Sequence, residues 1–256
     1  MNIKFLGVGS AFTTADYFQS NLLITADSGK RLLVDCGTDV RFSLAEAGLG
    51  PFDIDAVYLS HQHADHLGGI EFLVYATFFS PDFKHPLLFA EENLLHTAWE
   101  HSIKGGLGCV DDVPRKLDDF FRPQPVAENG SFEWEGNRFT LVKMPHVITQ
   151  VCQLYSYGLL MESSGGEKAF FSTDALYQPD ILAPLAEQVQ VIWHDAETRN
   201  PATGVHAHYE QLVDLPAAIK AKTWLYHYQP NPEFNPLEDG FLGFVAKGQE
   251  FTLKSR

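Results

Sequence analysis

The chain has 256 residues, of which 45% are hydrophobic, so it can bury one sizeable core. Its formal charge is −15 at pH 7, and such an excess of carboxylates disfavours a large interface with a nucleic acid. No stretch reaches the roughly 20 apolar residues of a membrane span, and the N-terminus lacks the apolar segment of a signal peptide. We therefore expect a cytoplasmic protein with a single domain over residues 1–256.

The three cysteines are Cys36, Cys109 and Cys152. An odd number of cysteines without C-x-x-C spacing argues against a full disulfide framework. It favours a reducing compartment, in agreement with the expected cytoplasmic location.

The first 60 residues alternate short apolar runs with turn residues, a pattern typical of strands. Strands are predicted over 3–8, 21–25, 31–35 and 56–59, and a helix over 39–47 that ends at a glycine.

Residues 70–145 show a less regular pattern. Apolar spacing predicts helices over 70–79 and 91–102, a strand over 87–90, and a break at the glycines of 105–108. The acidic and aromatic segment 111–121 is predicted to be a surface excursion, with a mobile lid over 105–121 as the alternative.

The second half is again rich in strands. It predicts hairpins over 131–144 and 151–172, strands over 188–193 and 223–226, a helix over 209–221 kinked at its proline, and a closing hairpin over 241–253. Two strand-rich halves with few helices predict two sheets packed together, with the helices outside.

One stretch concentrates residues that bind metals. His61, His63, Asp65 and His66 follow the apolar strand 56–59 and precede two glycines. Residues two apart in an extended segment face the same way, so His61 and His63 can reach one ion. Imidazole and carboxylate suit zinc, manganese or iron.

The same pattern, an apolar strand followed by a residue that can bind a metal ion, occurs three more times. The later strands lead to His146, Asp174 and His227. If these strands are neighbours, their ends meet at one edge, and the four segments together predict a metal site.

The H-x-H-x-D-H pattern from His61 to His66 resembles the motif of the metallo-β-lactamase superfamily. The likeness extends to the opening segment 5–11 and to the strand end 33–37, and so covers nearly the whole chain. It implies an α+β fold, the αββα sandwich, with two divalent ions, zinc foremost and manganese or iron as alternatives. By resemblance, one ion takes His61, His63, His146 and Asp174, and the other takes Asp65, His66, Asp174 and His227.

The C-terminal part resembles the ribonuclease Z-like branch, which includes cyclic-nucleotide phosphodiesterases. On that match, His206 is the proton donor and Asp195 the carboxylate that orients it. The branch usually has Glu where this chain has Asp195, and Ser or Thr where it has His208. His208 therefore remains an alternative for a share of the role.

The expected reaction is hydrolysis of a phosphodiester. Zinc lowers the pKa of a bound water to about 7, which supplies a nucleophile at neutral pH. His206 would protonate the departing alkoxide, Asp195 would fix its tautomer, and Asp65 would both bind metal and orient the nucleophile.

The substrate is expected to be small. Ribonuclease Z relatives grip tRNA with a long basic arm between the bridging Asp and the final His, and residues 174–227 contain no such insertion. A 3′,5′-cyclic nucleotide is the leading candidate. Base stacking is the minority interpretation for the aromatics Phe78, Phe79, Trp99, Phe120 and Phe121, most of which are expected in the core or at a dimer interface. Many relatives are homodimers, and we expect one here, without a membrane partner.

Three alternatives stay open. One is a ribonuclease Z-like endonuclease that processes RNA 3′ ends. Another is a metal-dependent hydrolase of esters, lactones or thioesters, although a proton-donor histidine suits a poor alkoxide leaving group better. The last is a binding protein that uses the metal site without catalysis, which the full ligand set disfavours.

Overall fold

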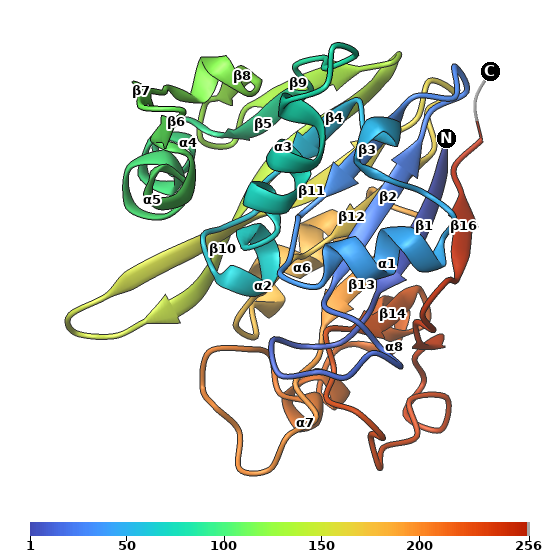
Figure 1. The fold of residues 1–256 in the computed structure, drawn as a ribbon. Helices are drawn as coiled ribbons and strands as arrows, with labels where there is room; N and C mark the ends of the chain where they lie inside the picture. The colour runs from blue at the N-terminus through green and yellow to red at the C-terminus, as the bar shows by residue number, and fades with distance from the viewer. Residues whose placement is uncertain (255–256) are drawn as a thin grey trace.

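The computed structural model describes residues 1–254 and places two seven-stranded β-sheets face to face, with helices on the outside (Figure 1). The predicted arrangement of two packed sheets with outer helices is confirmed.

The first sheet combines an antiparallel half with a parallel half. Its order is β16 (Glu250–Thr252), β1 (Asn2–Gly7), β2 (Asn21–Thr25), β3 (Arg31–Val34), β4 (Ala56–Tyr58), β5 (Leu87–Glu91) and β8 (Arg122–Val126). Pairing is antiparallel from β16 to β3 and parallel from β3 to β8.

The second sheet repeats this plan. Its order is β15 (Gly243–Phe244), β14 (Thr223–Tyr226), β13 (Val191–Asp195), β12 (Lys168–Phe171), β11 (Gln153–Glu162), β10 (Asn137–Ile148) and β9 (Ser131–Trp134). Pairing is antiparallel from β9 to β12 and parallel from β12 to β15. Two short strands, β6 (Cys109–Val110) and β7 (Val113–Pro114), form a separate ribbon.

Helices cover the outer faces of both sheets (Figure 1). The N-terminal half contributes α1 (Val40–Glu46), α2 (Ala64–Leu67), α3 (Ile70–Phe78), α4 (Glu92–Ala98) and α5 (Lys104–Leu107), with 3₁₀ turns at Pro51–Asp53 and Leu117–Asp119. The C-terminal half contributes α6 (Pro179–Ala186), α7 (Tyr209–Val213) and α8 (Ala217–Lys220). Within residues 1–254, no helix is long and apolar enough to cross a membrane.

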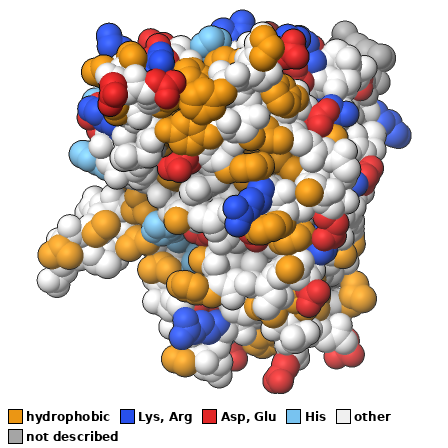
Figure 2. Space-filling model, in the orientation of Figure 1, with side chains coloured by type: hydrophobic (Ala, Val, Ile, Leu, Met, Phe, Trp, Pro, Cys, Tyr) orange, Lys and Arg blue, Asp and Glu red, His pale blue; other side chains and the backbone are white. Residues whose placement is uncertain are grey.

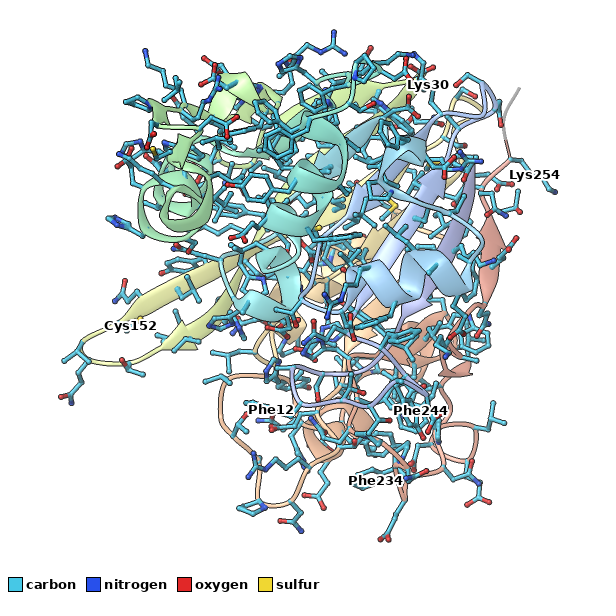
Figure 3. All side chains as sticks on the ribbon, in the orientation of Figure 1. Phe12, Lys30, Cys152, Phe234, Phe244 and Lys254 are labelled. Atoms are coloured by element: carbon cyan, nitrogen blue, oxygen red, sulfur yellow. The ribbon has the colours of Figure 1, made fainter. Side chains whose placement is uncertain are left out.

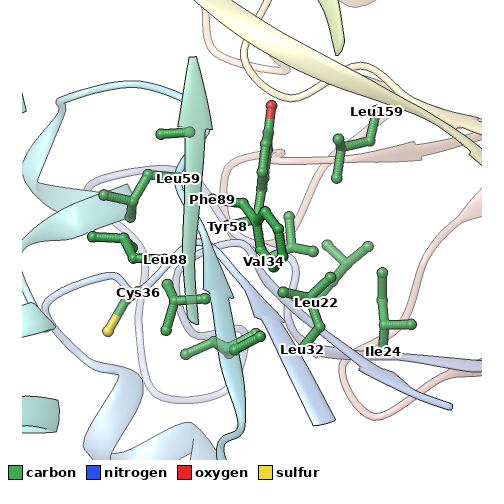
Figure 4. Close-up of a cluster of buried hydrophobic side chains, with 14 of the residues drawn as sticks. Leu22, Ile24, Leu32, Val34, Cys36, Tyr58, Leu59, Leu88, Phe89 and Leu159 are labelled. Atoms are coloured by element: carbon green, nitrogen blue, oxygen red, sulfur yellow. The ribbon is translucent and has the colours of Figure 1, made fainter. Parts of the chain in front are cut away.

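The main core fills the space between the sheets and continues under the N-terminal helices, and Figure 4 shows part of it, including Leu22, Val34, Tyr58 and Leu159. A second cluster lies under the C-terminal helices. The three cysteines form no disulfide, in agreement with the sequence, since Cys36 is buried and the other two are exposed and free.

Phe5 on β1 joins the two sheets. Its ring lies 5.8 Å from Trp193, 5.9 Å from Tyr226 and 6.2 Å from Phe171, all on the second sheet. The side chain is fully buried. We expect Phe5→Ala to lower the free energy of unfolding by about 3–5 kcal/mol, because it opens a cavity between the sheets. Chemical denaturation measures this loss, and the exposed Phe42→Ala should cost less than about 0.5 kcal/mol. Equal effects would contradict this packing.

Several predicted elements need correction. The helix that begins at Glu92 continues through a π-helical turn, Trp99–Ile103, into α5, so the glycines at 105 and 106 do not break it. The closing hairpin is wrong, because β15 pairs with β14 and β16 pairs with β1 in the other sheet. The helix predicted over 209–221 is two helices, because Pro216 separates α7 from α8. Helix α6 was not predicted.

The long hairpin of β10 and β11 projects from the body of the protein (Figure 1). Cys152, labelled in Figure 3, lies at its far end. At the base of this hairpin, histidine side chains reach the surface (Figure 2). The elements that carry the predicted metal ligands end in this region, so the fold positions the site here.

Candidate metal centre and proton donor

The predicted site residues lie at the ends of strands. His61 follows β4, Asp174 follows β12, Asp195 ends β13 and His227 follows β14, while α2 carries Asp65 and His66 directly after His63. The parallel strands β12, β13 and β14 are neighbours, so their carboxyl ends meet at one edge.

His146 reaches the site from within a strand rather than from a strand end. It lies within β10 at a bulge, where the register shifts between Pro145 and Val147. A bulge inserts one unpaired residue and turns its side chain away from the regular alternation. The sequence predicted that this strand ends at Met144, whereas the strand continues into the projecting hairpin.

The first predicted ligand group is brought together. His63 Nδ1 lies 3.1 Å from His61 Nε2 and 3.0 Å from His146 Nε2. Asp174 Oδ2 lies 3.7 Å from each of these two Nε2 atoms. Four ligands about 2.0–2.1 Å from a tetrahedral zinc would lie about 3.3 Å apart, so the spacing suits such an ion.

The second predicted ligand group lies beside the first and shares Asp174. His66 Nε2 is 3.2 Å from Asp65 Oδ2 and 3.3 Å from Asp174 Oδ2. His227 Nε2 is 3.9 Å from Asp65 Oδ2. The ligand atoms of each group all fall within 4.8 Å of one another.

Unpaired buried nitrogens indicate that the second group suits a cation. Nε2 of His66 and Nε2 of His227 are buried and have no hydrogen-bond partner. Buried polar atoms almost always have a partner, so these two atoms require one that the protein does not supply. A divalent ion bound by imidazole and carboxylate would satisfy both nitrogens.

The charge states also suit a cation. Burial, followed by the neighbouring His66, holds the pKa of His61 well below its usual range, and burial lowers the pKa of His146 to about 4. Neutral imidazoles are the form that binds metal. For Asp174, burial raises the pKa, but the nearby His227 and His66 outweigh it, so its pKa lies well below the usual value. The first ligand group therefore presents an ionised carboxylate, that of Asp174, beside the neutral imidazoles of His61 and His146.

A set of hydrogen bonds orients the histidines from behind. Asp35 Oδ2 accepts from His66 Nδ1 at 2.8 Å, and Val205 O accepts from His146 Nδ1 at 2.7 Å. The hydroxyls of Ser60 and Ser20 lie 3.0 and 3.1 Å from Nδ1 of His61 and His227. Such partners fix the ring orientation and increase ligand basicity.

These supporting residues were not predicted as site residues. Asp35 was noted only as part of the strand end 33–37 that resembles the family. No local sequence pattern distinguishes Ser20, which lies 207 positions from its partner His227. A backbone carbonyl such as that of Val205 carries no sequence signal at all. The one sequence feature that could have indicated a supporting residue is the acidic Asp35 directly after an apolar strand.

The backbone is in the left-handed region at three of these strand ends. The φ angles are 63° at Asp35, 55° at Thr173 and 61° at His227. Non-glycine residues are uncommon there and cost of order 1–3 kcal/mol each. The surrounding hydrogen bonds hold them, as where Ser60 N–H donates to Asp35 Oδ1 at 2.8 Å.

We expect Asp35→Ala to weaken metal binding about 10–100-fold, because it leaves the buried Nδ1 of His66 without an acceptor. Competition with a chromogenic chelator measures the dissociation constant. The exposed Asp82→Ala is the control and should bind metal as the unmodified chain does. Unchanged affinity in Asp35→Ala would show that the carboxylate does not support the site.

The predicted proton donor and its partner are also together. His206 Nδ1 lies 2.7 Å from Asp195 Oδ2, which also accepts from Ala175 N–H at 2.9 Å. The ring of His206 lies 5.1 Å from that of His227 and 5.0 Å from that of His146. Asp195 is fully buried. The shorter carboxylate of aspartate therefore reaches His206 directly.

The pKa of His206 reflects two opposing effects. Burial lowers it, but the charge of Asp195 and the hydrogen bond to it outweigh burial and raise the pKa to about 10. A protonated imidazole with Nδ1 engaged by Asp195 leaves Nε2 as the atom with a transferable proton.

His208 does not share this arrangement. Its Nε2 lies 3.0 Å from Arg199 O, and its Nδ1 accepts from Glu210 N–H at the start of α7. It supports the loop and the helix start. The geometry therefore favours His206 over His208 as the partner of Asp195.

The predicted base-stacking residues are mostly in the core. Trp99, Phe120 and Phe121 are buried and Phe78 packs against the core, so the expectation that most of the five lie in the core is confirmed and these four do not stack a base. Buried aromatics also account for part of the segment predicted as a surface excursion. An exposed aromatic beside the site is instead Phe12, 91% exposed and labelled in Figure 3. It lies two residues after Ser10, whose N–H donates to Tyr228 O.

The fold is that of known metallo-β-lactamase fold proteins. YhfI from Bacillus subtilis, a protein of that fold, aligns with a TM-score of 0.73 at 16% identity, covering 98% of this chain and 99% of its own. A diphosphatase from the PhnP family aligns with a TM-score of 0.73 at 20% identity, covering 99% and 98%. The predicted fold is therefore confirmed.

Sequence comparison is more specific. The family model described as Anti-Pycsar protein Apyc1 matches residues 1–251. The Anti-Pycsar protein Apyc1 of Paenibacillus harenae is 36% identical over 230 residues, which cover 89% of this chain and 90% of that protein. On this evidence, the chain belongs to the Anti-Pycsar protein Apyc1 family.

Proposed function

We propose that this protein is a dinuclear metal-dependent phosphodiesterase that hydrolyses a small substrate, a 3′,5′-cyclic nucleotide. The observation that carries the proposal is the pair of ligand groups that share Asp174, with the Asp195–His206 pair beside them. Family membership supports the class, a metal-dependent hydrolase of the phosphodiesterase type.

Seven side chains would hold the two ions. They are His61, His63, Asp65, His66, His146, Asp174 and His227, with Asp174 common to both groups. When bound, zinc or another divalent ion supplies Lewis-acid stabilisation of phosphate charge and activates water for attack.

His206 and Asp195 would deliver the proton. Hydrolysis joins a water oxygen to phosphorus and breaks one phosphorus–oxygen ester bond, leaving a ribose alkoxide that is a poor leaving group. Nε2 of His206 would donate its proton to that alkoxide as the bond breaks. Asp195 holds Nδ1 and so sets which nitrogen carries the transferable proton.

The predicted absence of a basic arm supports a small substrate. Between Asp174 and His227 the chain forms α6, β13, α7, α8 and β14, and none of these helices exceeds eight residues. With a formal charge of −15, the protein presents little to attract a polyanion. Among small phosphodiesters, family membership favours a cyclic nucleotide as the substrate.

A substrate panel tests the proposal. Metal-loaded protein is incubated with 3′,5′-cyclic nucleotides, a precursor tRNA, a p-nitrophenyl ester and bis-p-nitrophenyl phosphate. We expect cyclic-nucleotide turnover with a nucleoside monophosphate as the product. Turnover of the ester alone, or of the tRNA alone, would replace this function with one of the open alternatives.

The single domain and the homodimer remain predictions. Light scattering after size-exclusion chromatography should give twice the mass of the chain. One cooperative unfolding transition should accompany it if residues 1–256 form one domain.

A further inference from the structure

The segment from Glu197 to His206 links β13 to the proposed proton donor (orange, below the sheets in Figure 1). It supplies two groups to the site in consecutive positions. Val205 O accepts from His146 Nδ1 at 2.7 Å, and His206 Nδ1 donates to Asp195 Oδ2 at 2.7 Å. The conformation of one loop therefore sets both a metal-ligand orientation and the position of the acid.

Glu197 fixes the middle of this loop. Its side chain is buried, and both carboxylate oxygens lie 3.0 Å from the N–H of Thr203. Its own N–H donates to Ala207 O, and its carbonyl accepts from Tyr209 N–H, each at 2.9 Å. One residue thus fastens the loop at its middle and at its far end.

The burial of this carboxylate requires an explanation. Among residues 1–254, no Lys, Arg or His forms an ion pair with Glu197, although burying an unpaired charge is costly. The residue lies outside both ligand groups and outside the Asp195–His206 pair. What the carboxylate contacts is the loop backbone that precedes His206.

A second fastening holds the start of the loop independently. Gln229 Oε1 accepts from Thr198 N–H at 2.6 Å and from its hydroxyl at 3.0 Å, and Gln229 N–H donates back to that hydroxyl. Gln229 lies two residues after the predicted ligand His227. Loss of Glu197 should therefore free residues 203–206 while the start of the loop stays in place.

We propose that Glu197 is a positioning residue, whose carboxylate holds Thr203 and thereby keeps the proton donor His206 in place. The inference rests on the proposed phosphodiesterase function for its effect on turnover. Its structural part concerns the loop alone and can be tested without any substrate.

The activity test compares two leaving groups in the full-length, metal-loaded protein. A ribose alkoxide needs a proton as it leaves, whereas p-nitrophenolate leaves without one. We expect Glu197→Ala to lower kcat on a 3′,5′-cyclic nucleotide about 10–100-fold, and on bis-p-nitrophenyl phosphate less than about 3-fold. Glu197→Gln retains an oxygen that can accept from Thr203 and should restore kcat to within about 3-fold.

Two further variants sharpen the result. Thr203→Pro removes the N–H that donates to Glu197 and should change kcat as Glu197→Ala does. It tests the same contact if Glu197→Ala folds poorly. The exposed Glu187→Ala, at the C-cap of α6, is the matched control and should leave kcat on both substrates unchanged. Glu197→Ala combined with His206→Ala should lose no more than His206→Ala alone, because both act on one step.

Hydrogen exchange separates this inference from the proposed function. The amide of Thr203 should exchange faster in Glu197→Ala than in the unmodified chain, and Glu197→Gln should restore its protection. If no phosphodiester is hydrolysed by the unmodified chain, the proposed function fails and exchange alone decides the role of Glu197. Unchanged exchange, or equal losses on both leaving groups, would overturn the inference.

Discussion

Asp174→Ala is expected to lower turnover of a 3′,5′-cyclic nucleotide at least about 1000-fold, which corresponds to about 4 kcal/mol of transition-state stabilisation. Asp174 Oδ2 lies 3.7 Å from Nε2 of His61 and of His146 and 3.3 Å from Nε2 of His66. It is the side chain common to both ligand groups. Its removal should therefore weaken both ions at once.

Metal analysis and kinetics check this prediction together. Inductively coupled plasma spectrometry of Asp174→Ala should find fewer than two ions per chain, whereas the exposed Asp118→Ala should retain the content and activity of the unmodified protein. Asp174→Asn keeps an oxygen ligand but not the charge. Its metal content and activity should lie between those of Asp174→Ala and those of the unmodified protein. Full activity in Asp174→Ala would remove the bridging role.

His206→Ala is expected to have the second largest effect. Loss of the general acid should lower kcat on a cyclic nucleotide about 100–10,000-fold, with much less change on bis-p-nitrophenyl phosphate. His206 is outside both proposed ion-binding groups, so metal content should stay unchanged. The measurement is the ratio of the two kcat values at matched metal loading.

Other histidines supply the comparisons for this variant. His208→Ala tests the alternative donor and should lose far less, because its nitrogens contact Arg199 and Glu210 rather than Asp195. The exposed His96→Ala should have no effect. Equal loss on both leaving groups in His206→Ala would show that this residue supports the site without donating a proton.

The proximity of the candidate site residues was easier to predict from the sequence than the connections between the elements. His61, His63, Asp65 and His66 fall within six positions, so their proximity is local. Two of the distant candidate ligands, Asp174 and His227, were identifiable because parallel strands end at one edge, as β12, β13 and β14 do. Periodicity and strand ends carry that information in the chain itself.

The errors arise where tertiary packing decides. Apolar spacing in 241–253 indicates two strands, but no local signal shows that β15 and β16 join different sheets. Phe120 and Phe121 follow an acidic run that is typical of a surface, yet their side chains are buried. Glycines at 105 and 106 are helical because the preceding helix continues through them.

The supporting contacts could not be predicted at all. The hydroxyl of Ser20 and the carbonyl of Val205 reach His227 and His146 across long stretches of chain. Nothing in the sequence distinguishes Glu197 from the other residues among the 33 Asp and Glu of the chain. Only the fold shows that its side chain is buried. These contacts depend on how the loops pack.

The most direct test of the proposed dinuclear site is a metal titration followed by activity. Metal-free protein receives zinc or manganese in fractions of an equivalent, and the initial rate on a 3′,5′-cyclic nucleotide is measured at each point. A dinuclear site predicts no turnover without metal and a rate that reaches its maximum at two equivalents per chain. Full activity without metal, or a maximum at one equivalent, would contradict it.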